Sequence, residues 1–485
     1  MPINTESVIT TATKTPKFSL RWLLTINFFV YVVLLTARSW GSHRILHYEE
    51  TISVASALSQ SFFATLNDVA YGSLVPRILI FLAVQLPLEY LPITLLTIAT
   101  FLWAIFSTII FWVVYKKTHR YLPAFLASLV LILVPLPELG MQGIVWNSFW
   151  PMFIALGVVV ACRAYGESTR TTYLVALFAF LTAASNPVAG VLVLLLGFDY
   201  ICHKALRKRV LVVSVGLFVG MVFSLFVQIN QEPPLRYLGE WTQELAQTSE
   251  TLGRLEDSGA ATLRKAPSLD IVAVFKGLPG TIKYLLTQIA PEPIASRWVA
   301  SSSLGSDVLR IGTLFAVFLI LPLGALRLQT CRINESKFKE HGATLRLFLA
   351  AALVLVLQII LISGTLQTRQ LLFAPICFYW IAIFTISPAV SKLQDLNRSA
   401  VPTAILILAI IFALTALQNF RDPFDSNPRQ GGMGRYEEDP LWTLALSRAL
   451  GECQNMQPDD VVIISQKEEI WVDSPVVIRC KNLEH

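Results

Sequence analysis

Apolar runs of about 20 residues, almost free of charged side chains, recur along the chain, and a helix of about that length crosses a bilayer. The runs lie at 22–37, 92–115, 121–137, 148–162, 171–185, 187–201, 210–229, 308–326, 344–362, 371–387 and 400–418. Residues 76–88 (PRILIFLAVQLPL) are shorter and interrupted by proline, so we expect them to lie against the outer face or to re-enter. The pattern predicts an all-α polytopic membrane protein with about 11 transmembrane helices.

Lysine and arginine predict the orientation, since cytoplasmic loops are enriched in both. With the N-terminus inside, nearly all basic clusters fall in inner connections. They include Lys14, Lys17 and Arg21, then Lys116, Lys117 and Arg120, and then Lys204, Arg207, Lys208 and Arg209. Counting 76–88 as a full span would put the later clusters outside. The first apolar run is expected to be a retained helix and not a signal peptide. We therefore predict a multi-pass inner-membrane protein, N-terminus in and C-terminal domain extracytoplasmic.

Composition agrees with this class of protein. Hydrophobic residues make up 54% of the chain and charged residues 14%, against about 25% charged in soluble domains. The formal charge of +6 is explained by the inner loops, so no nucleic-acid partner is predicted. The predicted domains are a cytoplasmic tail at 1–21, a transmembrane domain at 22–418, a linker at 419–438 and a small domain at 439–485.

Two long outer loops, 38–91 and 231–306, are predicted to hold interfacial helices. In the first loop, Ile52, Ala55 and Leu58 begin an apolar repeat of three to four residues. No charged residue occurs from 51 to 67, which suits a helix at the membrane surface. Trp241 and Leu245 begin a similar stripe in the second loop.

The C-terminal segment predicts a small α+β domain. Asp439-Pro440 is a good helix start, and Trp442, Leu446, Ala449 and Leu450 follow on one helical face. Two β-like runs, 461–464 and 476–479, come next. Cys453 and Cys480 lie in this outer domain, and a disulfide between them is expected because so small a domain lacks a large core. The alternative is two buried thiols.

An acidic pair offers the first candidate for chemistry. Glu49 and Glu50 follow His47-Tyr48, about a dozen residues after the first span. A carboxylate at a membrane boundary is desolvated, which favours a role as general base. The alternative is that both residues favour the positive end of a helix starting near Thr51. No His or Cys cluster with metal-ligand spacing occurs; the sequence requires no cofactor and leaves a divalent cation open.

An arginine in a short outer loop is the second candidate. Arg369 breaks the charge rule that the other short outer loops obey, and its guanidinium suits a phosphate at headgroup depth. The alternative is an arginine at a helix end whose charged group reaches the interface. Weaker candidates for binding phosphate are Arg77, Arg44 and His43.

The layout resembles the GT-C superfamily of membrane glycosyltransferases. The features that carry the resemblance are Glu49-Glu50, the helix after them, the Arg77 region, the Ser185-Asn186-Pro187 turn and Arg369-Gln370-Leu371-Leu372-Phe373-Ala374-Pro375. The resemblance implies transfer of a sugar from a polyprenyl-phosphate-linked donor to an envelope glycan or lipid acceptor, of a bacterial envelope type. It would make Glu49 or Glu50 the base and Arg369 a holder of the lipid phosphate. The superfamily often has an aspartate in this pair, so the acting residue and a role for a metal stay open.

Two alternatives to the enzyme come from other functional classes. A flippase or transporter of lipid-linked saccharides would need a polar cavity and would not need the acidic pair. The span centres carry almost no ionisable side chains, which disfavours ion-coupled transport. A non-catalytic envelope-assembly protein would instead depend on 439–485 as a docking domain.

Overall fold

The computed structural model describes residues 19–39, 46, 48–59, 73–133, 144–229, 335–361, 373–390, 442–464 and 476–483. The α-helices are α1 (Leu20–Ser39), α2 (Tyr48–Ser59), α4 (Leu74–Ala83), α5 (Leu91–Thr118), α6 (Tyr121–Leu133), α7 (Phe149–Ala161), α8 (Thr169–Ser185), α9 (Leu192–Cys202), α10 (Arg207–Ile229), α17 (Glu335–Leu361), α18 (Phe373–Val390) and α20 (Trp442–Cys453). The 3-10 turns are η2 (Leu88–Tyr90), η3 (Trp146–Ser148), η4 (Ala164–Gly166), η5 (Pro187–Val191), η6 (Lys204–Leu206) and η13 (Cys480–Asn482). The strands are β1 (Val461–Ile464) and β2 (Val476–Arg479).

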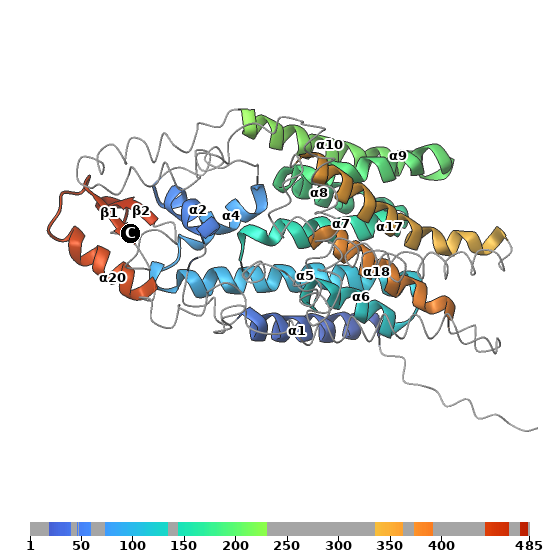
Figure 1. Cartoon of the computed structure of the whole chain (residues 1–485), viewed down its shortest axis with the longest axis horizontal. Coiled ribbons are helices and arrows are strands. Elements are labelled where there is room, and N and C mark those ends of the chain that lie inside the picture. The colour runs from blue at the N-terminus through green and yellow to red at the C-terminus, as the bar shows by residue number, and fades with distance from the viewer. Residues whose placement is uncertain are drawn as a thin grey trace, which may run out of the picture.

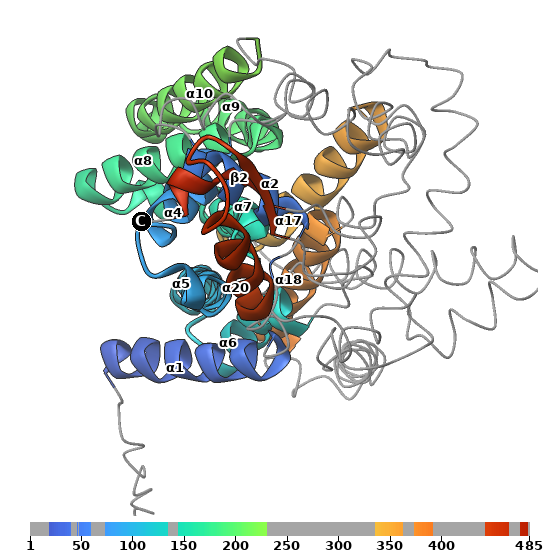
Figure 2. The same cartoon turned by 90° about the vertical axis from the view of Figure 1, so that its left-hand side faces the viewer.

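The long helices run side by side along the longest axis of the molecule (Figure 1). Helices α2, α4 and α20 and the two strands gather at one end, which we name the domain end. Viewed from that end, α20 and β2 lie in front of the helical bundle (Figure 2). The main pairings within the bundle are α8 with α10, α17 with α18, and α5 with α1 and α6.

Among the described residues, three helical stretches are long and apolar enough to cross a membrane: Leu20–Ser39, Leu88–Thr118 and Lys204–Val227. Shorter apolar helices fall on the predicted spans 121–137, 148–162, 187–201, 344–362 and 371–387, and α8 falls on 171–185. The predicted spans 308–326 and 400–418 lie outside the described residues. Helix α10 exposes Phe218 and Phe226, as a lipid-facing surface would. The protein is a membrane protein with a largely helical fold.

Small residues bring α8 and α10 close together. A Cβ added to Gly216 would stand 2.3 Å from the carbonyl oxygen of Ala176, and one added to Gly220 would stand 2.4 Å from that of Phe180. Neither distance leaves room for a side chain. This is the small-residue packing typical of helices in membranes, where backbone approach provides the contact.

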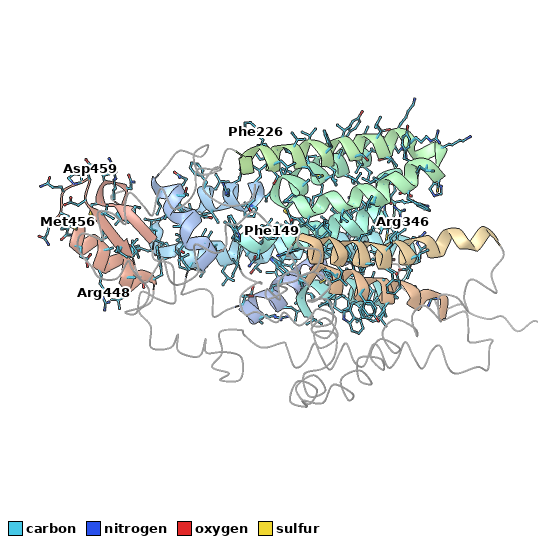
Figure 3. The ribbon with its side chains drawn as sticks, turned by 45° about the horizontal axis from the view of Figure 1, so that its top comes forward. Phe149, Phe226, Arg346, Arg448, Met456 and Asp459 are labelled. Carbon is cyan, nitrogen blue, oxygen red and sulfur yellow. A yellow bond between two sulfur atoms is a disulfide. The ribbon has the colours of Figure 1, made fainter. Side chains whose placement is uncertain are left out.

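A buried ion network joins three helices at the end of the bundle opposite the domain end. The Asp199 carboxylate of α9 accepts hydrogen bonds from Arg163 at 2.9 Å, from Arg346 at 2.5 Å and from the Tyr165 hydroxyl. Arg346, on α17 (labelled in Figure 3), also donates to the carbonyl of Val160 at 2.9 Å. The sequence did not predict the partners of Asp199.

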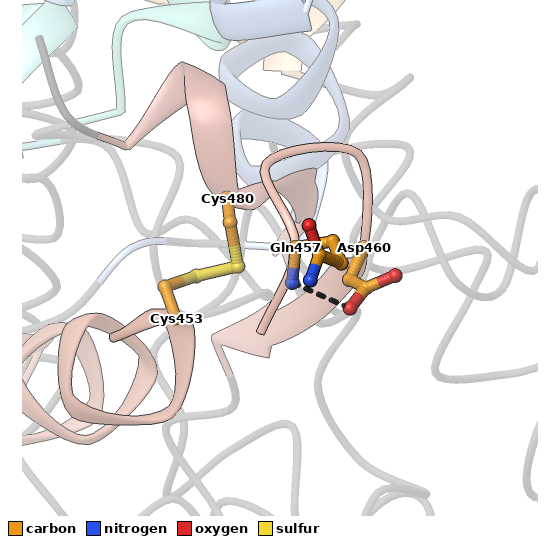
Figure 4. The surroundings of a disulfide bond; sticks show 4 residues. All are labelled: Cys453, Gln457, Asp460 and Cys480. Atoms are coloured by element: carbon orange, nitrogen blue, oxygen red, sulfur yellow. Dashed lines mark hydrogen bonds between the residues drawn. A yellow bond between two sulfur atoms is a disulfide. The ribbon is translucent and has the colours of Figure 1, made fainter. Parts of the chain in front are cut away.

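In the C-terminal segment, the predicted helix, two strands and disulfide are present. The strands pair antiparallel, with Val461 opposite Arg479, and a disulfide joins Cys453 to Cys480 (Figure 4). Beside it, the Gln457 backbone N–H donates to Asp460 at 2.7 Å. Trp442, Leu446 and Ala449 are buried as predicted, whereas Leu450 is exposed because it lies at the edge of the packed face. The residues that would start the helix, Asp439 and Pro440, lie outside the described part.

The domain packs onto the rest of the chain. The indole N–H of Trp442 donates to the carbonyl of Leu88 at 2.6 Å, and β2 packs against α2. Figures 1 and 2 both show the strands beside α2. Figure 3 places Arg448, Met456 and Asp459 at the far tip of this end. The domain is thus seated on the segment that carries the acidic pair.

The first outer loop differs from its prediction. Helix α2 begins at Tyr48, earlier than Thr51, and it lies between α4 and β2. Its buried residues include Thr51, Ser53 and Ser56, so the helix is not a surface helix with one buried apolar face. The apolar repeat wrongly predicted a helix at the membrane surface, because α2 is covered by protein on more than one side. Helix α4 has ten residues, too few to cross a bilayer, as expected for 76–88.

Candidate functional site

Glu50 lies in the first turn of α2 and is buried, with 2% of its surface exposed. Its Oε1 accepts a hydrogen bond from the backbone N–H of Val145 at 2.6 Å. This contact ties the acidic pair to the segment that leads into α7, 95 residues later. The side chain of Glu49 lies outside the described part, so the structure orients Glu50 alone of the pair.

Arg77 reaches the same segment from α4. Its guanidinium carbon stands 5.9 Å from the centre of the Trp146 ring, and the side chain is buried. A cation over an indole face is attracted by the ring quadrupole. The hydroxyl of Ser185, at the end of α8, accepts from the N–H of Val75 at 3.0 Å and fixes the start of α4. Ser185 therefore helps to fix the helix that carries Arg77.

A carboxylate and a guanidinium thus converge on two consecutive residues, Val145 and Trp146. The convergence occurs where α7 begins, next to Phe149 (labelled in Figure 3), between the bundle and the elements of the domain end. Negative and positive groups held on one short turn form a polarised site. Such a site is suited to a reaction in which a proton leaves one group and negative charge develops on another.

Several buried polar atoms around this turn have no hydrogen-bond partner. Within the described ranges they are Asn147 Oδ1, Ser148 Oγ, Trp150 Nε1, Ser73 Oγ and Asn186 Nδ2. Ser73 caps α4 and Asn186 caps η5, while the other three belong to η3 and α7. Buried polar atoms are normally paired, so a local group of unpaired ones calls for an explanation such as a ligand or water. Neutral amide, hydroxyl and indole groups match a ligand rich in hydroxyls.

Sequence reasoning did not find the turn at 146–148. Its signal is a short polar interruption, Trp-Asn-Ser, at the start of an otherwise apolar span. Three of the predicted phosphate-binding residues, Arg369, Arg44 and His43, lie outside the described residues, so their place is not tested. No group of three His, Cys, Asp or Glu residues in the described part is arranged to hold a metal ion.

No protein-family model matches the sequence, and no curated protein matches it. Solved structures to which the chain is similar include archaeal oligosaccharyltransferases. The apo enzyme of Archaeoglobus fulgidus is 15% identical with a TM-score of 0.46, over 87% of this chain and 60% of that one. The enzyme from the same archaeon, in complex with an inhibitory peptide and a dolichol-phosphate, is 13% identical with a TM-score of 0.45, over 90% and 58%. This chain therefore spans about three fifths of the length of these proteins.

Proposed function

We propose that this protein transfers a sugar from a polyprenyl-phosphate-linked donor to a hydroxyl of an acceptor on the extracytoplasmic face of the membrane. The observation that supports this most directly is the convergence of Glu50 and Arg77 on residues 145–146, beside unpaired neutral polar atoms. The convergence supplies a base, a cation and groups suited to a saccharide. An envelope glycan or lipid remains the acceptor predicted from the resemblance.

The orientation in this proposal rests on the basic residues. Lys116, Lys117, Arg163 and Arg209 lie at the end of the bundle opposite the domain end. Lys116 forms an ion pair with Glu167 there, and Arg209 donates to the carbonyl of Gly166. Because cytoplasmic ends of membrane helices carry the excess of Lys and Arg, we assign that end to the cytoplasm. The domain end, with the acidic pair, then faces outward.

The reaction would proceed as follows. The acceptor oxygen forms a bond to the anomeric carbon while the bond from that carbon to the phosphate oxygen breaks. The bonding pair leaves with the polyprenyl phosphate, and the acceptor proton passes to the Glu50 carboxylate. Arg77 would neutralise the negative charge that develops on the phosphate. A phosphate is a good leaving group, so positioning and charge neutralisation provide most of the rate.

The hydrogen bond from Val145 gives Glu50 its proposed role within the pair. A carboxylate whose Oε1 is held by a backbone N–H has a fixed orientation, as a base must have to meet its substrate. Glu49 is the alternative base, as the sequence left open.

Transfer assays in membranes offered a panel of polyprenyl-phospho-sugars test the proposal. Glu50→Gln should lower the transfer rate by about 100-fold or more, the usual contribution of a general base. Glu89→Gln is the matched control, because Glu89 is an exposed carboxylate in η2 at the same end. Loss with Glu49→Gln alone would move the base to Glu49. Full transfer by the double variant Glu49→Gln/Glu50→Gln would refute the base assignment, and a flippase would show lipid translocation without transfer.

A further inference from the structure

The last turn of α1 ends in two buried polar residues that the proposed reaction does not use. Arg38 has 6% of its surface exposed and Ser39 has none. They lie away from the end of the bundle that carries Lys116 and Lys117, because Arg38 contacts the last turn of α6 and α6 begins just after α5 ends in those lysines. The Arg38 guanidinium donates a hydrogen bond to the carbonyl of Ile132, in the last turn of α6.

Within the described part of the chain, no carboxylate pairs with the charge of Arg38. Among the described residues, the ion pairs of the bundle are those of Lys116 with Glu167 and of Arg163 and Arg346 with Asp199. Arg38 takes part in none of them. Burying an unpaired charge is strongly unfavourable. The end of α6 offers only about half an elementary charge, shared over its last carbonyls. A positive charge therefore remains at this point of the bundle.

Ser39 adds a second, independent observation. Its hydroxyl is fully buried and has no hydrogen-bond partner within the described ranges. A guanidinium fork and a neighbouring hydroxyl are the donors that bind phosphate oxygens, and a phosphate would supply the missing negative charge. A water molecule would satisfy the hydroxyl but would not balance the charge.

The depth of the two residues identifies the kind of molecule that brings the phosphate. Helix α1 is an apolar helix of 20 residues, long enough to span the hydrocarbon core, and Arg38 and Ser39 terminate it. The end of such a helix lies at the level of the lipid headgroups. Several apolar side chains of α1, Trp22, Phe29 and Val33, are exposed, so lipid can approach along the helix.

We propose that Arg38 and Ser39 bind the phosphate group of a membrane lipid at the domain end of α1. The inference does not depend on sugar transfer, because any lipid phosphate of that leaflet supplies the same chemistry. Two sources qualify: a polyprenyl phosphate, which would make this a donor-lipid site, and the headgroup of an anionic phospholipid.

Native mass spectrometry of the purified full chain tests the proposal, with titrations of polyprenyl phosphate, phosphatidylglycerol and phosphate-free diacylglycerol. We expect saturable binding of a phosphate lipid and none of diacylglycerol. Arg38→Gln should weaken binding by about tenfold or more and Ser39→Ala by a few fold, since hydrogen bonds to charged groups are the strong ones. Arg21→Gln is the matched control, because Arg21 is an exposed arginine at the other end of the same helix.

Competition between the two phosphate lipids assigns the source. If polyprenyl phosphate displaces phosphatidylglycerol but phosphatidylglycerol does not displace polyprenyl phosphate, the site binds the donor lipid. If each lipid displaces the other equally, the site binds phospholipid headgroups. If Arg38→Gln does not fold, Arg38→Lys and Ser39→Ala carry the test. Unchanged binding in all folded variants would overturn the proposal and leave Arg38 as a cap of α6. Binding of diacylglycerol as strong as that of the phosphate lipids would overturn it as well. Glu50→Gln should leave lipid binding unchanged, so failure here is distinct from failure of the proposed reaction.

Discussion

Two ion pairs of the same length should differ widely in their effect on stability. The pairs Arg346–Asp199 and Lys116–Glu167 both have an N–O distance of 2.5 Å. The side chains of the first pair are 6% and 0% exposed, and those of the second are 38% exposed each. Because solvent screens the second pair, an exposed pair contributes about 0–1 kcal/mol. Removing one partner of a buried pair costs about 3–5 kcal/mol, since the other charge stays buried and uncompensated.

Asp199→Asn keeps the shape of the side chain and removes its charge. We expect it to lower the free energy of unfolding by about 3–5 kcal/mol, because Arg346 and Arg163 then lose their common counter-ion. Glu167→Gln should cost less than about 1 kcal/mol. Denaturant unfolding in detergent micelles, followed by tryptophan fluorescence, compares the two variants under one set of conditions.

A double-mutant cycle adds the decisive comparison. Replacing Arg346 by Met in the Asp199→Asn background should recover part of the loss, because it removes one of the uncompensated charges. The reasoning would be refuted if Asp199→Asn lowered the free energy of unfolding by no more than Glu167→Gln does. It would also be refuted if Arg346→Met destabilised the Asp199→Asn protein as much as it destabilises the unmodified protein.

Two further predictions concern helix packing and the C-terminal domain. Gly216→Ala should separate α8 from α10 and destabilise the bundle by about 1–3 kcal/mol, since its Cβ would meet the Ala176 carbonyl oxygen at 2.3 Å; thermal unfolding in detergent measures this. Gly197→Ala, with nothing within 4 Å of its Cβ, is the control and should be neutral or slightly stabilising. Replacing Cys453 and Cys480 by Ser should cost the domain about 3.5 kcal/mol, the loop-entropy value for a separation of 27 residues. Limited proteolysis should then cleave the domain while the bundle stays protected, and equal resistance of both forms would contradict the estimate.

Local patterns predicted the elements that depend on neighbouring residues in the chain. Apolar runs located helices α1, α5 and α10, because a span needs a continuous length of apolar side chains. The β-branched runs at 461–464 and 476–479, together with Cys453 and Cys480, predicted the two strands and the disulfide. In each case, the residues from which the element was predicted lie within a few dozen positions of one another.

Contacts between distant segments could not be predicted in this way. Asp199 and Arg346 are 147 residues apart, and Glu50 and Val145 are 95 apart, so no periodicity connects them. Arg38 went unnoticed because an arginine at the end of a span is common, and only the structure shows that it is buried with no carboxylate partner among the described residues. Sequence reasoning therefore identified Glu50 and Arg77 as candidates but could not find the turn on which they meet.

The seat of the C-terminal domain has a consequence for biogenesis. Trp442 donates its hydrogen bond to Leu88, which is 354 residues earlier in the chain. A ribosome releases Trp442 only after every described helix of the bundle has been synthesised, and the partner Cys480 of the disulfide emerges later still. The cover over α2 therefore assembles only after the described helices of the bundle have been synthesised. A nascent chain that stalls before Trp442 would have an inserted bundle with α2 uncovered. Quality-control proteases would recognise such a chain by the exposed surface of α2.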